Sequence, residues 1–319
     1  MTFSVIVPVY NRPDEVRELL ESLAKQTFTD FEVLIVEDGS SEPCEDVARE
    51  FQDRLNLRYF YKENSGQGFS RNYGFDRARG DWYVVFDSDC LVPPDYFRIV
   101  RNHLDQQPLD AWGGPDRAHD DFTPLQKAIS YSMTSPLTTG GIRGNARHAG
   151  TFHPRSFNMG ISAEVYRATG GYRITRMGED IEFSLRIIKQ GFRTGLIPDA
   201  WVYHKRRTSL GDFFRQAHFF GRARINIARF HPGEIKWVHA LPALFTVGLA
   251  CYLLLIPLNP PLFGWLSMPF GLFLATLLMH AGVITGSLRV GALAVFTSLV
   301  QLTGYGSGFI REQFRNRTG

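Results

Sequence analysis

The chain has 319 residues, and its 35 Lys and Arg nearly balance its 32 Asp and Glu, which gives a formal net charge of +3. This length allows one large domain or two smaller ones. Because no block of Lys and Arg alternates with aromatic residues, we expect no nucleic-acid partner. The three cysteines, Cys44, Cys90 and Cys251, have neither metal-site spacing nor an even number for disulfides, so reduced cytosolic thiols are the simplest interpretation.

The first hundred residues alternate between predicted strands and predicted helices. Apolar segments at 3–9, 31–36, 57–61 and 82–86 are typical of strands. Helical segments begin after Asn11 and extend over 44–53 and 68–78, with Gly80 as the expected C-terminal cap. This alternation with short connections predicts a right-handed, mostly parallel α/β sheet. Because Thr2 leads directly into the first strand, we expect no signal peptide and a soluble half that stays in the cytosol.

The pattern changes in the next hundred residues. The predicted elements are a helix at 94–107, strands near 111–115, 157–162, 192–197 and 200–203, and a helix at 178–191. Ile181, Leu185 and Ile188 share one face of the second helix. Residues 137–155 are rich in Gly, Thr and basic side chains and lack apolar periodicity. A loop of that length inside a compact domain is usually functional or disordered.

A basic stretch and three apolar blocks follow. Residues 204–236 contain eight Lys and Arg against Asp212 and Glu234, and no charged residue then occurs until Arg289. The apolar blocks lie at 237–257, 262–287 and 290–310. Each is about 20 residues long, which is enough to cross a bilayer as a helix. A buried soluble helical domain is the alternative, but such a domain needs a solvated polar face, so we predict transmembrane helices.

The number of membrane crossings stays open at this point, and two or three helices are expected. The last block is loosened by Gly304, Gly306 and Gly308. Lys and Arg favour the cytoplasmic side of a membrane. Three crossings would place the basic C-terminal tail outside, whereas two crossings with a re-entrant or interfacial last block would keep it inside. We expect an inner-membrane protein whose basic stretch anchors it at the cytoplasmic face or binds anionic lipid there.

Two aspartates follow the strand predicted at 82–86. Asp87 and Asp89 are one residue apart, so their carboxylates converge on one small volume. Like charges that close repel, and a cation or sugar hydroxyls between them would make the arrangement favourable. In open α/β sheets the ligand crevice lies outside the carboxyl ends of the strands, where this pair falls. The alternative is a solvated turn, because Asp and Ser are ordinary turn residues.

Six blocks of sequence are informative in combination. They are VIVPVYNR at 5–12, VEDGS at 36–40, GFSRNYG at 68–74, FDSDC at 86–90, FNMGIS at 157–162 and GED at 178–180. In this order they resemble the inverting family 2 glycosyltransferases, over roughly residues 2–224. The resemblance implies the GT-A fold, a Rossmann-like and mostly parallel α/β sheet, followed here by C-terminal transmembrane helices. It also implies a nucleotide-diphosphate-sugar donor, with a UDP-sugar as the first expectation, and a divalent cation, Mn²⁺ or Mg²⁺.

The resemblance assigns one group of residues to the donor. They are Pro8, Val9, Tyr10, Asp38, Arg71, Asp87 and Ser88. Asp89 would bind the metal, and Asp87 would hold the ribose hydroxyls or join the metal site. Asp38 would accept a hydrogen bond from the base, although a cap of the next helix is an alternative. Tyr10 would form part of the nucleoside wall, with plain packing as the alternative, and Arg71 would bind the donor rather than remain a solvated helix charge.

A second group is assigned to the acceptor and to catalysis. Inversion needs one carboxylate to take a proton from the acceptor hydroxyl as it attacks the anomeric carbon. The resemblance places this base at Asp180, with Glu179 binding the acceptor or orienting the site. Two acids at a helix start also suit the helix dipole, which is the structural alternative. The sugar pocket would be shaped by Asn158, Met159 and Gly160.

Three residues at or after residue 204 receive the remaining roles. His204 would bind the metal or the diphosphate, with a purely structural imidazole as the alternative. Arg215 and Gln216 would clamp the diphosphate or an acceptor phosphate. Residues 215–219 read RQAHF, which departs from the Gln-x-x-Arg-Trp signature of processive polysaccharide synthases. The resemblance therefore implies a nonprocessive enzyme.

The resulting hypothesis is a membrane-anchored transferase that moves one sugar to a glycan or lipid-linked glycan in envelope polysaccharide assembly. Its expected parts are a GT-A domain at 1–235 (nucleotide-binding half 1–100, acceptor half 101–203, basic juxtamembrane segment 204–235), transmembrane helices at 236–311 and a tail at 312–319. A polyprenyl-phosphate glycosyltransferase is the enzymatic alternative; the basic segment suits it, whereas the loop at 137–155 suits a bulkier acceptor. The non-enzymatic alternative is a membrane protein that senses nucleotide sugars, but a sensor has no need of Asp180 beside Asp87 and Asp89.

Overall fold

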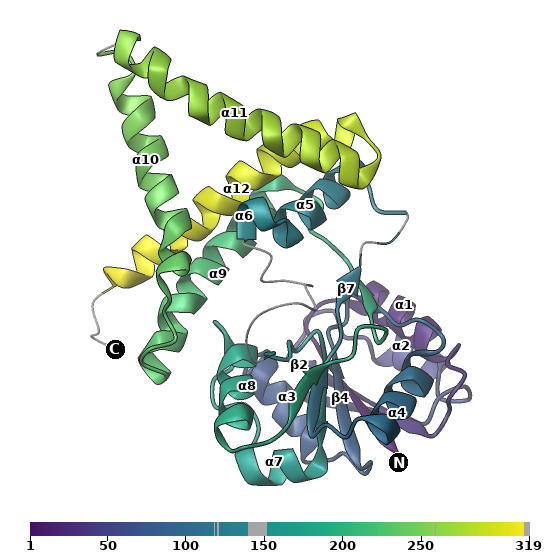
Figure 1. Ribbon diagram of the computed structural model, residues 1–319. Coiled ribbons are helices and arrows are strands. Elements are labelled where there is room, and N and C mark those ends of the chain that lie inside the picture. The colour runs from purple at the N-terminus through teal and green to yellow at the C-terminus, as the bar shows by residue number, and fades with distance from the viewer. Residues whose placement is uncertain (118, 120, 140–151, 259, 316–319) are drawn as a thin grey trace. The chain divides into compact units, whose positions relative to one another are not determined.

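The computed structural model divides the chain into two compact units, each described here by itself (Figure 1). The first unit comprises Met1–His119 and Ala146–Lys205, and the second comprises Asp120–Asn145 and Arg206–Gly319. The structure describes residues 1–117, 119, 121–139, 152–258 and 260–315. Most of the loop predicted at 137–155 therefore lies outside the described residues.

The first unit is built on a seven-stranded sheet within the described residues. The strands are β1 (Phe3–Val9), β2 (Phe31–Asp38), β3 (Leu57–Lys62), β4 (Trp82–Phe86), β6 (Ala111–Gly113), β8 (Asn158–Ser162) and β9 (Thr194–Leu196). Their order is β3-β2-β1-β4-β8-β6-β9. β8 runs antiparallel to both of its neighbours, and the other pairings are parallel. The prediction of a mostly parallel α/β sheet is confirmed.

The strand order creates a topological switch point beside β1. From β1 the chain proceeds outward to β2 and β3, and it then returns to place β4 on the opposite side of β1. In open α/β sheets the ligand site lies at the carboxyl ends of the strands beside such a switch point. The residues that follow β1 and β4 lie at this end of the sheet.

Helices cover both faces of the sheet because successive strand residues point in opposite directions. Phe3, Val5, Val7 and Val9 of β1 pack with α1 (Pro13–Leu23), α2 (Glu45–Glu50) and α4 (Tyr96–Gln106). Ile6 of the same strand packs on the other face with α3 (Gln67–Phe75), α7 (Ala163–Thr169) and α8 (Glu179–Lys189). Strands buried on both faces read as continuous apolar runs, which is why the sequence signals them clearly.

The end of α3 differs from the prediction. The helix ends at Phe75 with Asp76 as its C-terminal cap, so Gly80 does not cap it. Gly80 instead passes close to β1, and its N–H donates to Oγ of Ser4 at 2.9 Å. A Cβ at Gly80 would lie 2.9 Å from the Ser4 nitrogen. The glycine is required by close backbone approach and not by helix termination.

The second unit is helical in its described residues. Its elements are α5 (Pro124–Thr134), α6 (Pro136–Thr139), α9 (Leu210–Phe230), the 3₁₀ turn η1 (Trp237–Ala240), α10 (Leu241–Leu255), α11 (Pro260–Thr285) and α12 (Leu288–Gln313). Three described segments are long and apolar enough to cross a membrane: Trp237–Leu255, Gly264–Thr285 and Leu288–Gln313. They coincide with the three predicted apolar blocks.

Two features of this unit were not anticipated. The sequence analysis assigned no helix to α5, which begins with a capping box between Thr123 and Gln126. α12 is continuous through Gly304, Gly306 and Gly308, all of which are buried. These glycines were expected to loosen the segment. They instead allow neighbouring helices to approach, because a Cβ on Gly308 would overlap the carbonyl oxygen of His218 on α9.

Candidate active site

The candidate site lies at the carboxyl ends of β1, β2 and β4. Arg12 follows β1 and Asp89 follows β4, and Nη1 of Arg12 lies 2.7 Å from Oδ2 of Asp89. The two loops thus meet across the switch point. Burial alone would raise the pKa of Asp89, but His204 and Arg12 outweigh burial and hold that pKa well below its usual range. Asp89 is therefore an anion at neutral pH.

His204 reaches Asp89 through a small second sheet of β5 (Cys90–Leu91), β10 (Val202–His204) and β7 (Asp116–Arg117). The antiparallel pairing of β10 with β5 sets His204 opposite Cys90. This register brings Nε2 of His204 to 3.0 Å from Oδ1 of Asp89. The imidazole stacks on Phe157, with ring centroids 5.1 Å apart and planes 18° apart. The side chains predicted to share a metal site, Asp89 and His204, are in contact.

The donor atoms at this point fit a divalent cation. A carboxylate oxygen of Asp89, Sγ of Cys90 and Nε2 of His204 lie within 4.8 Å of one another. Cys90 is a neutral thiol, because burial raises its pKa well above the usual value, and it donates to the Phe157 carbonyl at 3.4 Å. Carboxylate oxygens suit Mn²⁺ and Mg²⁺, and neutral imidazole is a common metal ligand. Asp87, whose side chain is one-third exposed, can add a second carboxylate.

Arg71 joins Asp87, predicted to bind the donor, to Glu179, predicted to bind the acceptor or orient the site. Its Nη2 donates to Oδ1 of Asp87 at 2.8 Å, and its Nη1 donates to Oε1 of Glu179 at 3.2 Å. The guanidinium is 1 % exposed and lies over the ring of Tyr172. Arg71 thus positions one carboxylate after β4 and one in α8, and its burial excludes the alternative of a solvated helix charge.

The Glu-Asp pair opens α8, as predicted, and its two acids have different surroundings. Glu179 is buried, and besides Arg71 it accepts a hydrogen bond from Nε2 of Gln67. Burial, and then the neighbouring charge of Asp180, raises the pKa of Glu179, and Arg71 offsets part of this rise. Asp180 is more accessible, with 19 % of its side chain exposed and Nη1 of Arg155 3.4 Å from its Oδ2. Asp180 is therefore the more exposed acid of the pair.

Asp38 at the end of β2 organises the loop before α3. Its Oδ1 accepts hydrogen bonds from Lys62 and from the Ser65 N–H, and its Oδ2 accepts one from the Gly66 N–H at 2.8 Å. Burial alone would raise the pKa of Asp38, but these partners lower it. The suggested alternative, a cap of the next helix, is wrong, because the N-cap of α2 is Cys44, whose N–H donates to Oε2 of Glu37 at 2.8 Å and not to Asp38.

The remaining donor residues lie on the β1 and β4 loops. Val9 is buried, whereas Tyr10 directly after β1 is 52 % exposed, so this aromatic ring is available for stacking. Pro8 is the partly exposed penultimate residue of β1. Ser88, between the two aspartates, is buried. Roles in nucleoside binding remain predictions for all four residues.

The three residues predicted to shape the sugar pocket belong to β8 and have core contacts. Asn158 is fully buried, accepts a hydrogen bond from the Tyr96 hydroxyl at 2.5 Å and donates to the Ala200 carbonyl at 2.8 Å. Met159 is also fully buried. A Cβ on Gly160 would overlap the ring of Trp112. Their described roles are packing and strand positioning, and a pocket role remains a prediction.

Two site residues, Arg12 and Lys62, were not predicted, and two predicted residues belong to the second unit. Arg12 is part of the first sequence block but was given no role, and Lys62 ends β3 beside Asp38. Nothing in the local pattern around either residue signals its partner, since both pairs are formed across separate strands. Arg215 and Gln216 belong to α9 of the second unit, where Arg215 pairs with Asp212.

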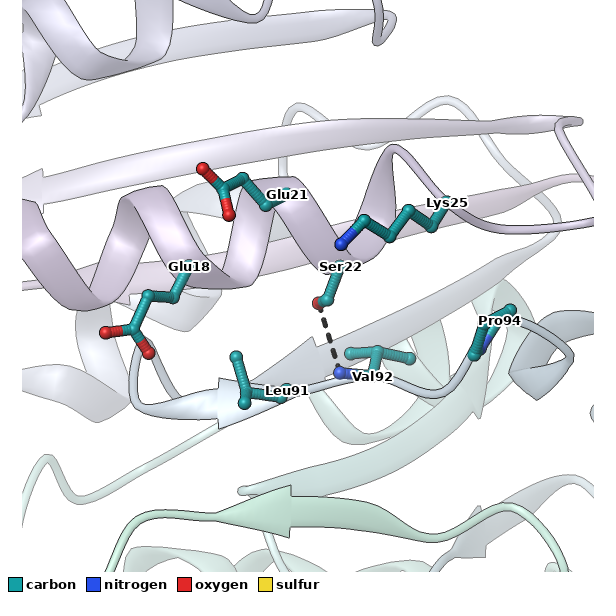
Figure 2. A pocket seen from close by; sticks show the side chains of 7 residues that line it. All are labelled: Glu18, Glu21, Ser22, Lys25, Leu91, Val92 and Pro94. Atoms are coloured by element: carbon teal, nitrogen blue, oxygen red, sulfur yellow. Dashed lines mark hydrogen bonds between the residues drawn. The ribbon is translucent and has the colours of Figure 1, made fainter. Parts of the chain in front are cut away.

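A surface pocket near this region has different residues. It lies between α1 and the segment after β5 and is lined by Glu18, Glu21, Ser22, Lys25, Leu91, Val92 and Pro94 (Figure 2). The Val92 N–H donates to Oγ of Ser22 across it at 3.1 Å. None of the carboxylates described above lines this pocket, and we assign it no role in the site.

Comparison with known proteins identifies the class of fold and then the family. A mannosyltransferase of Pyrobaculum calidifontis, PcManGT, solved with GDP-Man and Mn²⁺, superposes with a TM-score of 0.66 at 18 % identity over 93 % of this chain and 86 % of that one. Staphylococcus aureus TarS 1–349, solved with UDP-GlcNAc, gives a TM-score of 0.51 at 18 % identity over 98 % of this chain and 92 % of that one. These likenesses show the GT-A fold. Residues 4–170, just over half of the chain, match the family model for glycosyl transferase family 2, and the chain belongs to that family.

Curated relatives align over part of their length. The uncharacterized glycosyltransferase EpsJ of Bacillus subtilis is 26 % identical over 65 % of this chain and 62 % of its own length. The poly(ribitol-phosphate) beta-N-acetylglucosaminyltransferase TarS of Staphylococcus aureus is 35 % identical over 34 % of this chain and 20 % of its own length. The chain thus spans less than two-thirds of these relatives.

Proposed function

We propose that this chain is a membrane-anchored, inverting, nonprocessive glycosyltransferase that moves one sugar from a nucleotide-diphosphate-sugar to a glycan or lipid-linked glycan in envelope polysaccharide assembly. The observation that carries this proposal is the bridge made by Arg71, which holds Asp87 of the donor side and Glu179 of the acceptor side on one buried guanidinium. A ligand-sensing domain needs the donor side alone. An enzyme needs both sides at a fixed separation.

The donor end is supported by three features of the β1, β2 and β4 loops. The exposed ring of Tyr10 offers a stacking surface to a nucleobase. Asp38 and Asp87 supply carboxylate acceptors for the N–H and O–H groups of a nucleoside. A UDP-sugar is our first candidate, because TarS has been solved with UDP-GlcNAc, and PcManGT, solved with GDP-Man, makes a GDP-sugar the second.

Asp89 and His204, with Asp87 as a further acid, would hold the divalent cation, Mn²⁺ or Mg²⁺. When bound, the cation would neutralise the negative charge that develops on the leaving diphosphate. The protein's own part is to keep Asp89 ionised, and the nearby Arg12 and protonatable His204 do this. β5 and β10 hold Asp89 and His204 in register, so the ligand atoms are positioned before a cation arrives.

Asp180 would act as the general base. Both acids accept hydrogen bonds, but Glu179 is buried whereas Asp180 is partly exposed. As the acceptor oxygen forms its bond to the anomeric carbon, its proton would pass to the Asp180 carboxylate. The bond from the anomeric carbon to the diphosphate would break on the opposite face, so the configuration inverts and the nucleoside diphosphate leaves.

The experiment that tests this function is nucleoside diphosphate release from detergent-purified protein. UDP-, GDP- and dTDP-sugars are each supplied with Mn²⁺ or Mg²⁺, and the natural chain is compared with Asp89→Ala and Asp180→Asn. We expect metal-dependent release from one donor class, lost in both variants. Donor binding by calorimetry without release would mean that an acceptor is still needed, and lipid-linked glycans are then added. The absence of both donor binding and nucleoside diphosphate release, with every donor in the panel, would contradict the enzymatic function.

A further inference from the structure

The helices α10 and α11 form an antiparallel hairpin. The Tyr252 hydroxyl lies 2.5 Å from Oγ of Ser267. The rings of Tyr252 and Phe270 are 6.0 Å apart, and those of Phe245 and Phe273 are 6.3 Å apart. The start of α10 and the end of α11 therefore lie at the same end of the hairpin, which we call its base.

α12 contacts both helices of the hairpin at this base. Near the start of α10, Oγ1 of Thr246 donates to the Leu302 carbonyl of α12 at 3.4 Å. A Cβ on Gly306 of α12 would overlap the carbonyl of Pro242, also in the first turns of α10. Near the end of α11, a Cβ on Gly291 of α12 would lie 2.7 Å from the Leu278 carbonyl.

These contacts set the direction of α12. Gly291 and Gly306 are 15 positions apart, a distance of about 22 Å along a helix that rises 1.5 Å per residue. α12 thus connects the start of α10 to the end of α11 instead of running parallel to these helices. When both of these ends lie at one face of a bilayer, a helix that connects them runs along that face.

α12 also packs on α5 and α9. Oγ1 of Thr297 donates to the Ala128 carbonyl of α5 at 3.1 Å and lies 2.6 Å from Oγ of Ser132. At its far end, Glu312 of α12 is buried and accepts hydrogen bonds from Arg222 at 2.9 Å and Arg229 at 2.8 Å, both on α9. Figure 1 shows α12 alongside α9.

Neither α5 nor α9 can cross a bilayer. The segment that contains α5 leaves the first unit after His119 and returns to it at Ala146, so it begins and ends on the side of that unit. α9 begins five residues after the first unit ends, and its 21 residues include five charged ones, Asp212, Arg215, Arg222, Arg224 and Arg229. Each Arg or Asp at the centre of a span costs about 2.5–3.5 kcal/mol. Both helices therefore stay on the side of the first unit.

We propose that the α10–α11 hairpin crosses the membrane and that α12 does not, although α12 is long and apolar enough to do so. α12 lies in the interface of the leaflet that faces the first unit, with α5 and α9 against it. Its exposed arginines, Arg289, Arg311 and Arg315, then meet anionic lipid headgroups on that side. This placement also removes the conflict with the positive-inside rule that three crossings create. The inference rests on the membrane anchoring proposed above and not on the catalytic chemistry.

Cysteine labelling of membrane vesicles tests this topology. Cys251→Ala removes the exposed native thiol, and the buried Cys44 and Cys90 remain. Single cysteines are then introduced as Gln52→Cys in the first unit, Leu258→Cys at the hairpin tip and Gln313→Cys at the end of α12, all at exposed positions. An impermeant maleimide is applied to right-side-out and inverted vesicles, and detergent-solubilised protein gives the full signal for each site.

We expect Gln52→Cys and Gln313→Cys to label from the same side and Leu258→Cys to label from the other. Labelling of Gln313→Cys from the side opposite to Gln52→Cys would mean three crossings and would overturn the proposal. Labelling of all three from one side would overturn the crossing hairpin. Alkaline carbonate extraction separates these failures from a failure of the anchoring itself, because a protein that carbonate releases from the vesicles is not embedded at all.

Discussion

Arg12 and the proposed divalent cation would compete for the same carboxylate, and this leads to a prediction with an unusual sign. Nη1 of Arg12 lies 2.7 Å from Oδ2 of Asp89. A cation that takes both oxygens of Asp89 must displace this guanidinium. Arg12→Met keeps the length and apolar stem of the side chain and removes its charge. We therefore expect the variant to bind Mn²⁺ more tightly than the natural chain, while its fold is unchanged.

The size of the effect follows from the surroundings of the pair. A hydrogen bond between charged groups contributes about 1.5–3 kcal/mol net. Asp89 is largely buried, but nearly one-third of the Arg12 side chain is exposed, so water weakens the pair and the lower end applies. Because about 1.4 kcal/mol corresponds to a factor of ten, the dissociation constant for Mn²⁺ should fall by roughly tenfold.

Isothermal titration of Mn²⁺ into the detergent-purified full chain measures this constant without any donor sugar. Arg17→Met is the matched control, because Arg17 lies on α1, which begins directly after Arg12, and pairs with the exposed Glu50 instead of Asp89. Asp89→Ala should abolish binding at this site. An Arg12→Met variant that binds Mn²⁺ as weakly as, or more weakly than, the natural chain would refute competition and show that Arg12 instead holds Asp89 in its ligating position.

Three further predictions concern the base, the helix packing and acid stability. Asp180→Asn should lower turnover by about 10²–10⁴-fold and leave donor affinity unchanged, because only proton removal is lost; product release and calorimetry measure the two. Gly308→Leu should lower the free energy of unfolding by about 1–3 kcal/mol, and with it the melting temperature, because the leucine side chain would overlap the α9 backbone. Lys62→Met should reduce the acid sensitivity of the free energy of unfolding, measured by denaturant titration between pH 3 and pH 6.

The sign of the last prediction follows from the lowered pKa of Asp38. A carboxyl group whose pKa is lower in the folded state stabilises that state fully above its unfolded pKa, about 3.9 for Asp. This stabilisation is lost as the pH falls through the unfolded value toward the folded one. Lys62 contributes to the lowered pKa of Asp38, so Lys62→Met should lose less stability than the natural chain as the pH falls. If the free energy of unfolding depends on pH below pH 4 as steeply in the variant as in the natural chain, this role of Lys62 is contradicted.

Each of the other two predictions has a matched control. Asp199→Asn makes the same chemical change as Asp180→Asn at an exposed position of the first unit, and it should keep full turnover. Gly248→Leu makes the same change as Gly308→Leu on α10, where a Cβ would meet no atom within 4 Å, and its melting temperature should stay near that of the natural chain. Equal losses in both glycine variants would show that helix approach is not the cause.

The sheet was predictable because buried parallel strands occur in the sequence as apolar runs that end in turn residues. Phe3–Val9 was located to the residue, and Trp82–Phe86 likewise. The antiparallel position of β8 between β4 and β6 was not predictable. The direction of a strand depends on the strands with which it pairs, and the local sequence does not indicate it. Gly80 was misread for a related reason, because a glycine needed for close approach to a distant strand resembles one that ends a helix.

The site was predictable to the extent that its residues occur in contiguous blocks. Asp87, Asp89 and the Glu179-Asp180 pair stand in short motifs, and the structure brings Asp87 and Glu179 to one arginine. Its pairings could not be derived, because Arg12 with Asp89 joins positions 77 residues apart in sequence. Arg71 was predicted to belong to the site, but its burial depends on contacts between α3 and α8, and no pattern near Arg71 in the sequence indicates these contacts.

The two units handle charge in opposite ways, and this difference bears on how the chain works. In the first unit, Arg12 and His204 keep Asp89 ionised at the loop where we propose that a cation binds. In the second, Glu312 is 1 % exposed between two arginines of α9, so its role is to fix one helix to another. Removal of one partner from a buried pair costs about 3–5 kcal/mol. The same residue types therefore supply the proposed cation site in one unit and a fixed attachment of α12 to α9 in the other.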